Sequence, residues 1–311
     1  MFCKAAIRST KLFAALIIVL VASCKSSQKS TAPQTVQLDE PLANDKTLLW
    51  QVSGNGLTQP SYVFGTIHVI KSEDFFTGQN VLKKLRQSEN LVLEMDLDNV
   101  RSMEVAAASI LPDNKTIKDF VDPDDYLLLE SFFADSLGYP MALFKTAYAR
   151  LKPFFLQQMI YIRFLGDNVM SYETEFLEQT RDQNIKVIGL ESLNEQLSFI
   201  DVMSIEEQYE GLLRAIRESS QQNAYLDTLV EAYKDKDIHK LYELVASNDE
   251  FKDISNTLID ERNQNWVPKL ENAFRSGRTF VAVGAGHLGG EKGILQLLRD
   301  RGYEVVPVTM D

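Results

Sequence analysis

The feature that most constrains the fold of this chain is a strand, helix, strand order that occurs near both of its ends. Near the start, the apolar run "PSYVFGTIHV" is followed by a helical pattern in "GQNVLKKLRQS" and by the apolar run "NLVLEMD". Near the end, "RTFVAVGAGH", "GEKGILQLLRDR" and "YEVVPVTM" repeat that order. Strands that are joined through a helix run parallel. The sequence therefore predicts an α/β (α+β) fold whose central sheet, mostly parallel or mixed, is built from the N- and C-terminal segments.

Other segments add a hairpin and a large helical middle layer. "LLWQVSG" and "PSYVFGTIHV" are short β-type runs separated by "NGLTQP", in which Asn55-Gly56 favours a tight turn. A further helix and strand pair, "YETEFLEQTRDQ" and "IKVIGLES", lies between the two end units. Residues from 123 to 165 and from 204 to 274 carry apolar side chains at helical spacing. We expect these two stretches to cover the sheet as a helical layer.

The first 44 residues are expected to precede the folded domain. Residues 1–24 combine basic residues, the apolar run "LFAALIIVLVA" and small residues before Cys24, as secretion signals do. The segment "LVASC" resembles a bacterial lipobox, which implies cleavage before Cys24 and a lipid on that residue; an ordinary signal peptide or an N-terminal anchor is the alternative. Residues 25–44 are polar and favour a flexible tether. Residues 45–311 would then be a domain lipid-anchored to a bacterial membrane in the cell envelope, on its periplasmic or surface side.

Cysteine content and charge exclude several classes of function. The chain has two cysteines, and the signal takes one while the lipid takes the other, so neither disulfides nor a cysteine nucleophile remain. Removal of residues 1–24 takes away three basic residues, which leaves 29 basic against 44 acidic residues and a formal charge of −15. A chain this acidic does not bind nucleic acid through bulk electrostatics.

Four side chains that bind metals or move protons fall at the ends of predicted strands. His68 and His287 each end a GxxH pattern that begins at Gly65 or Gly284, and the chain has only three histidines. Glu94 ends "LVLE" and Glu191 ends "IKVIGLE". Ligands collect at the carboxyl ends of parallel strands, so these side chains are expected to converge. Two imidazoles with one or two carboxylates suit zinc, manganese or cobalt, and such an ion activates water for hydrolysis.

Plainer interpretations stand beside this one. A single histidine after a strand is more often structural, and each glutamate alone is as well explained by a helix cap or an ion pair. His239 lies on a polar helical pattern and is expected to be exposed to solvent. Arg262, within a charged helical stretch, is most simply a surface ion-pair partner. Several motifs of other enzymes are absent, since the sequence contains no GxSxG, P-loop or HExxH.

Several segments taken together resemble a known family. "WQVSGNGLTQPSYVFGTIHV", "LVLEMD", "VIGLESLNEQL", "ERNQNW" and "FVAVGAGHLGGEKGILQLLRDRGYEVVPV" look like the TraB/GumN family, which is related to the Tiki metalloproteases. The resemblance extends from about residue 48 to residue 308. It implies that His68, Glu94 and His287 belong to a metal or catalytic centre, and that Arg262 and Glu191 surround it.

The resemblance also draws attention to the carboxylate in "SYETEF". Many members of the family carry an aspartate where this chain has Glu173, so the carboxylate remains but reaches one methylene further. If this group binds the metal directly, the geometry of the site or the choice of metal differs here.

These observations predict a membrane-anchored, metal-dependent hydrolase that cleaves a peptide or related amide bond. His68 and His287 would hold the metal, Glu94 would complete the ligand set or act as general base, and Arg262 would steady the developing oxyanion. The alternative is a lipoprotein that binds or sequesters a peptide or cell-envelope ligand without turnover. The substrate, the metal and the oligomeric state stay open at this point.

Overall fold

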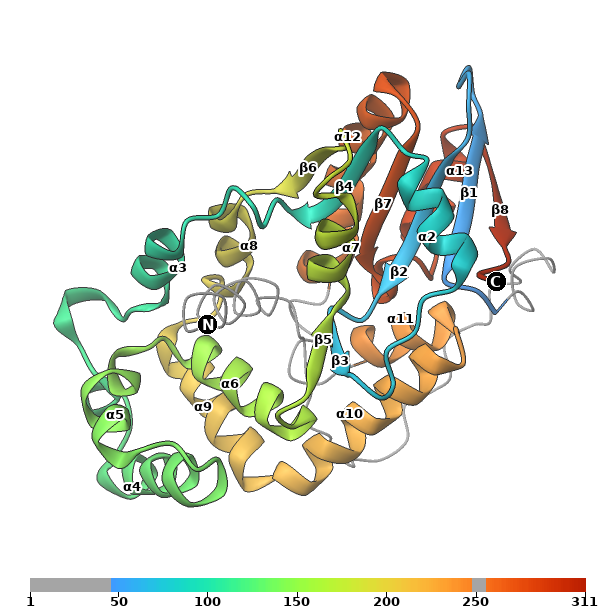
Figure 1. Cartoon of the computed structure of the whole chain (residues 1–311). Coiled ribbons are helices and arrows are strands. Elements are labelled where there is room, and N and C mark those ends of the chain that lie inside the picture. Colours follow the sequence, from blue (N-terminus) through green and yellow to red (C-terminus); the bar gives the residue numbers. More distant parts are fainter. Residues whose placement is uncertain (1–45, 248–255) are drawn as a thin grey trace.

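The computed structural model describes residues 46–247 and 256–311. The predicted signal, the lipidation site at Cys24 and the tether lie outside the described residues. The described part has the predicted mixed architecture, with helices packed around a central, mostly parallel sheet (Figure 1).

The central sheet has six strands in the order β6-β4-β7-β2-β1-β8. Its strands are β1 (Leu49–Gly54), β2 (Ser61–Thr66), β4 (Asn90–Met95), β6 (Lys186–Glu191), β7 (Thr279–Gly284) and β8 (Tyr303–Val308). Neighbours from β6 to β2 pair in parallel, whereas β1 pairs antiparallel with both β2 and β8. The carboxyl ends of β6, β4, β7 and β2 therefore meet along one edge of the sheet.

The predicted hairpin opens the domain. Strands β1 and β2 pair antiparallel, and Asn55 and Gly56 adopt φ values of 45° and 81° in the turn. The amide of Leu57 donates to the carbonyl of Gly54 at 2.9 Å. The left-handed backbone that this turn requires is the conformation that Asn and Gly adopt most readily.

The two end units form, but their strands are not neighbours in the sheet. Helix α2 (Gln79–Arg86) joins β2 to β4, and α13 (Ile294–Asp300) joins β7 to β8. Strand β7 lies between β2 and β4, while β2 and β1 separate β7 from β8. The strands that each helix joins run parallel, as predicted, without being neighbours, because the two ends of the chain interleave in one sheet.

The third predicted pair forms as well. Helix α7 (Tyr172–Thr180) precedes β6, which adds to the sheet beside β4. A small antiparallel pair that the sequence did not predict, β3 (Val69–Lys71) with β5 (Val169–Ser171), connects the segment after β2 to the start of α7. Strands of three residues are too short to give a clear alternating pattern.

The middle of the chain is helical, but only part of it covers the sheet. Helices α10 (Ser219–Lys234) and α11 (Ile238–Ala246) pass below the carboxyl ends of the strands in Figure 1, and α12 (Arg262–Ser276) packs beside β4 and β6. Helix α8 (Leu193–Ile200) follows β6, and α3 (Ser102–Ser109) follows β4.

The remaining helices form a lobe with its own core. They are α4 (Pro123–Ser131), α5 (Met141–Thr146), α6 (Pro153–Leu165) and α9 (Ile205–Arg217), at the lower left of Figure 1. Their buried side chains, among them Leu129, Phe144 and Leu212, make a hydrophobic cluster separate from that of the sheet. The predicted helical layer is therefore divided between a cover over the strand ends and a lobe beside it. Within residues 46–247 and 256–311, no helix combines the length and apolar character needed to cross a membrane.

Candidate metal centre

The carboxyl edge of the sheet brings the predicted side chains together. His68 follows β2, Glu94 lies near the end of β4, Glu191 ends β6, and His287 follows β7 in a short 3-10 turn, η7 (Ala285–His287). Arg262 reaches them from the first position of α12. All five are buried, each with less than a tenth of its surface exposed. Chain segments that are far apart in sequence thus build one polar cluster inside the protein.

The glycines of the two GxxH patterns make this close approach possible. A Cβ built on Gly65 would lie 2.8 Å from Cβ of Ala285 and 2.9 Å from Cδ1 of Leu288. A Cβ on Gly284 would lie 3.1 Å from Nε2 of His68 and 3.3 Å from Oε1 of Glu94. The first glycine therefore lets β2 pack against the turn after β7, and the second leaves space in front of the functional groups.

Glu94 lies at the centre of the cluster. Its Oε1 accepts the backbone N–H of Gly284 at 2.8 Å, and its Oε2 accepts from Nη2 of Arg262 at 2.7 Å. Burial alone raises the pKa of Glu94, but the Arg262 guanidinium and the imidazoles of His68 and His287 outweigh it and lower the pKa to about 2. The carboxylate is therefore ionised and fixed through both of its oxygens.

His68 is held by a carboxylate behind its ring. Its Nδ1 lies 2.7 Å from Oε1 of Glu173, which also accepts from Thr66 at 2.8 Å. A carboxylate only accepts, so Nδ1 carries a proton; in the neutral form of the ring, the lone pair of Nε2 then faces Glu94, 3.5 Å away. Burial lowers the pKa of His68, but Glu173 and Glu94 together raise it above its ordinary value.

The backbone at His68 has an unusual conformation. Its φ is 55°, in the left-handed region that favours glycine, at a cost on the order of 1 kcal/mol. The carbonyl of His68 accepts from the amide of Tyr172, which ties this residue to the start of α7. That turn directs the imidazole toward Glu94 instead of into the sheet.

His287 has a matching arrangement with a neutral partner. Its Nδ1 lies 2.7 Å from Oδ1 of Asn263, whose amide nitrogen donates to the carbonyls of His287 and Lys292. Because that amide nitrogen faces two carbonyls, Oδ1 is the acceptor and Nδ1 of His287 is the donor. The Nε2 lone pair then faces Oε1 of Glu94, 3.9 Å away, and Nη1 of Arg262, 3.4 Å away. Burial lowers the pKa of His287 to about 3, so the ring is neutral.

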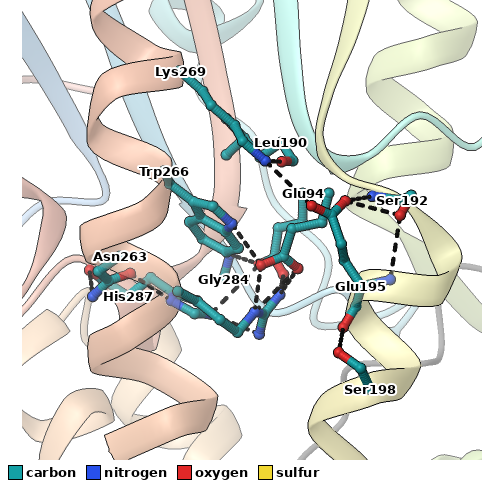
Figure 2. Close-up of polar contacts among 12 residues, drawn as sticks. Glu94, Leu190, Ser192, Glu195, Ser198, Asn263, Trp266, Lys269, Gly284 and His287 are labelled. Atoms are coloured by element: carbon teal, nitrogen blue, oxygen red, sulfur yellow. Dashed lines mark hydrogen bonds and ion pairs between the residues drawn. The ribbon is translucent and has the colours of Figure 1, made fainter.

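Arg262 and Glu191 form a buried ion pair beside these groups. The Nε of Arg262 donates to both oxygens of Glu191 at 3.1 and 3.2 Å, and Nη2 donates to Oε2 at 3.0 Å. The indole N–H of Trp266 donates to Oε1 of Glu191 at 2.7 Å. The Trp266 ring packs against the His287 ring in a tilted arrangement, with ring centres 4.5 Å apart (Figure 2). The guanidinium also lies over this indole. The interpretation of Arg262 as a surface ion pair is wrong, because Arg262 and its partners are buried.

Asn263 and Trp266 are the site residues that the sequence reasoning missed. Both lie in "ERNQNW", and Trp266 is one helical turn after Arg262, so the two share a face of α12. The π-helical turn η6 (Asn256–Glu261) directly precedes Arg262, and such turns are frequent at functional sites. The spacing of one helical turn between Arg262 and Trp266 is the signal that was available. His239, expected to be exposed, is half-buried on α11.

The donor chemistry of the cluster fits a divalent cation. Two Nε2 lone pairs and Oε1 of Glu94 face one another, and each imidazole donates its other N–H to an oxygen, as histidine ligands of metals usually do. Glu94, Glu173 and Glu191 carry a formal charge of −3 against +1 on Arg262, so two negative charges are left without a matching cation. A bound cation would neutralise them.

The cluster is not, however, a finished set of metal ligands. Over residues 46–247 and 256–311, no group of three His, Cys, Asp or Glu side chains has the placement of a ready metal site. The separations of 3.5 and 3.9 Å from Glu94 to the imidazoles, with Arg262 close to His287, describe the cluster as it stands. Glu173 lies behind His68 and contacts its Nδ1, so the extra methylene of this residue supports the histidine and does not reach the space beside Gly284.

Comparison with known proteins finds similarity to two proteins named metalloproteases. Metalloprotease TIKI1 of Danio rerio is 22% identical over 332 residues, which covers 88% of this chain and 65% of that protein. Metalloprotease TIKI2 of Danio rerio is 22% identical over 338 residues, which covers 90% of this chain and 64% of that protein. The chain thus spans slightly less than two thirds of the length of these relatives. No solved structure matches the chain significantly.

A protein family also matches most of the chain. Residues 48–307 match the TraB/PrgY/gumN family, and they include both GxxH patterns, Glu94, Glu191 and Arg262. On this match, the chain belongs to the TraB/PrgY/gumN family.

Proposed function

We propose that this protein is a metal-dependent hydrolase that cleaves a peptide or related amide bond. The observation that carries the proposal is the pair of buried imidazoles whose Nε2 atoms face Glu94 while Glu173 and Asn263 accept from their Nδ1 atoms. The similarity to proteins named metalloproteases supports the reaction class. Zinc, manganese and cobalt all suit a site of imidazole and carboxylate donors.

In this proposal each side chain has one task. His68 and His287 hold the cation through Nε2, and Glu94 completes the ligand set through Oε1. When bound, the cation supplies Lewis-acid activation of a carbonyl group and of water. A pKa of about 2 makes Glu94 a poor proton acceptor near neutral pH, which favours the ligand role over that of general base.

Arg262 is better placed to position Glu94 than to steady an oxyanion. Its Nε and Nη2 atoms donate to Glu191 and Glu94, and Nη1 faces His287. Glu173 and Asn263 likewise position the two imidazoles and keep their Nε2 atoms unprotonated. We assign these three residues positioning roles.

The membrane anchor is a further part of the proposal. A lipid on Cys24 would hold the domain at a bacterial membrane, with residues 25–44 as the tether. Detergent partitioning of the mature protein, compared with a Cys24→Ser variant, tests it. The anchor is refuted if both proteins partition alike into the aqueous phase.

Hydrolysis is tested with the full chain loaded separately with zinc, manganese or cobalt. The substrate is a library of internally quenched peptides, and Glu94→Gln is compared with Glu210→Gln, an exposed glutamate on α9. We expect turnover by the wild type and by Glu210→Gln, and loss of about 100-fold or more in Glu94→Gln. Binding of peptides without turnover by any metal form would support the alternative of a binding lipoprotein.

A further inference from the structure

A small apolar cavity lies directly beside the two histidines. Its volume is about 90 Å³. One side consists of the strand-end residues, including His68, Gly284, Gly286 and His287. The opposite side consists of aliphatic side chains from α10, α11 and η6, namely Leu229, Leu241, Val245 and Ile259. A molecule that reaches the imidazoles through this cavity must therefore place an apolar group against these side chains.

The aliphatic wall is fixed relative to His287. Leu241 and Val245 are one turn apart on α11, and Leu229 lies on α10. Helix α11 packs tightly on the loop after η7, because a Cβ on Gly289 would lie 2.5 Å from the carbonyl oxygen of Ile238. That loop directly follows His287, the last residue of η7. The tight packing of α11 against this loop therefore fixes the position of the aliphatic wall relative to His287.

The size of the cavity sets which groups fit. A dry apolar cavity of roughly 150 Å³ accepts benzene, so a cavity of 90 Å³ favours an aliphatic group over a bulkier aromatic side chain. Gly286, in η7, lines the cavity opposite Val245. A Cβ there would lie 3.5 Å from Cγ2 of Val245, an ordinary contact, and its φ is not in the left-handed region. Gly286→Ala therefore fills the cavity without a steric clash.

We propose that this cavity is the specificity pocket of the site and takes one aliphatic side chain, of the size of valine, leucine or isoleucine. The substrate residue that carries this side chain lies next to the bond that faces His68, Glu94 and His287. The proposal rests on the hydrolase function above and adds the substrate class, a peptide with an aliphatic residue beside the cleaved bond. The wall residues named above carry no charge that would pair with an ionised substrate group.

The first test measures binding without turnover. Methyl NMR spectra of the full chain in detergent are recorded during titration with N-acetyl-L-leucinamide and, separately, with N-acetyl-L-phenylalaninamide. In the wild type we expect the leucine amide to shift the methyl signals of Leu241 and Val245, and the phenylalanine amide to leave them unchanged. Gly286→Ala should weaken binding of the leucine amide by about 10-fold or more, as the loss of one methylene's space does in apolar pockets.

A second variant enlarges the pocket instead of filling it. Val245→Ala should let the phenylalanine amide bind, whereas Val202→Ala, which truncates an exposed valine, should behave as the wild type does. Equal binding of both amides by the wild type, or no change in Gly286→Ala, would overturn the proposal. If the amides bind as expected but no metal form cleaves peptides with an aliphatic residue, the pocket stands and the hydrolase function fails. If peptides are cleaved with no preference for aliphatic residues, the function stands and the pocket assignment fails.

Discussion

Removal of Glu191 should destabilise the protein far more than removal of a neighbouring exposed glutamate. Glu191 pairs with Arg262 through both oxygens and accepts the indole N–H of Trp266, all within the interior. Breaking a buried ion pair costs about 3–5 kcal/mol, and an orphaned buried N–H costs about 1–3 kcal/mol. Because Arg262 keeps its contact with Glu94, we place Glu191→Ala near the lower end of the combined range, at about 4 kcal/mol.

The assay is urea unfolding in the presence of EDTA, with Glu195→Ala as the matched control. Glu195 is exposed and accepts from the amide of Ser192 in the capping box of α8, so its loss should cost about 1 kcal/mol (Figure 2). Glu191→Gln keeps an acceptor for Trp266 but loses the charge, and should fall between the two. A cost for Glu191→Ala no larger than that for Glu195→Ala would refute the buried network as described.

Two further predictions concern the centre of the cluster. Gly284→Ala should abolish stoichiometric metal binding while the protein stays folded, because the new methyl group would lie 3.1 Å from Nε2 of His68. Metal titration measures the binding, and circular dichroism measures the folding. Metal retained by the variant would contradict the prediction. In EDTA, the free energy of unfolding should fall on acidification from about pH 6.5 to about pH 2. The folded-state pKa values of His287 and Glu94 are lowered to about 3 and about 2, so the unfolded chain takes up these protons at a higher pH than the folded protein does. The raised pKa of His68 acts in the opposite sense, since its contribution is complete below about pH 6.5 and is lost as pH rises through the folded-state pKa. Urea unfolding at pH 7, 5 and 3 checks the sign, and a His287→Ala variant with an unchanged slope between pH 6.5 and 3 would contradict it.

The strands of the sheet were predictable because their apolar, β-branched runs are short and bounded by turn residues. Asn55-Gly56 marked the hairpin, and the helical patterns between strands marked the crossovers. The order of strands was not predictable, because the sequence of β7 does not indicate that this strand lies between β2 and β4. That choice depends on which apolar faces match after the chain has collapsed, and a single sequence does not contain a local signal for it.

The candidate site was likewise only partly predictable from the sequence. His68, Glu94, Glu191 and His287 could be placed together because strand ends share an edge of the sheet. The partner of each ring could not be assigned, because Asn263 meets His287 only once α12 has packed beside the sheet. The aliphatic wall of the cavity belongs to α10, α11 and η6. In the sequence, these aliphatic residues indicate only helix faces that pack against a core, so the cavity could not be predicted.

The most direct test of the account is the metal content of the purified full chain, measured by elemental mass spectrometry after incubation with zinc, manganese or cobalt. The wild type is compared with a His68→Ala/His287→Ala double variant and with His239→Ala, which removes the third histidine. The account predicts one metal ion per chain in the wild type and in His239→Ala, and none in the double variant, with helical content nearly unchanged. Full occupancy in the double variant, or no stoichiometric metal in the wild type, would contradict it.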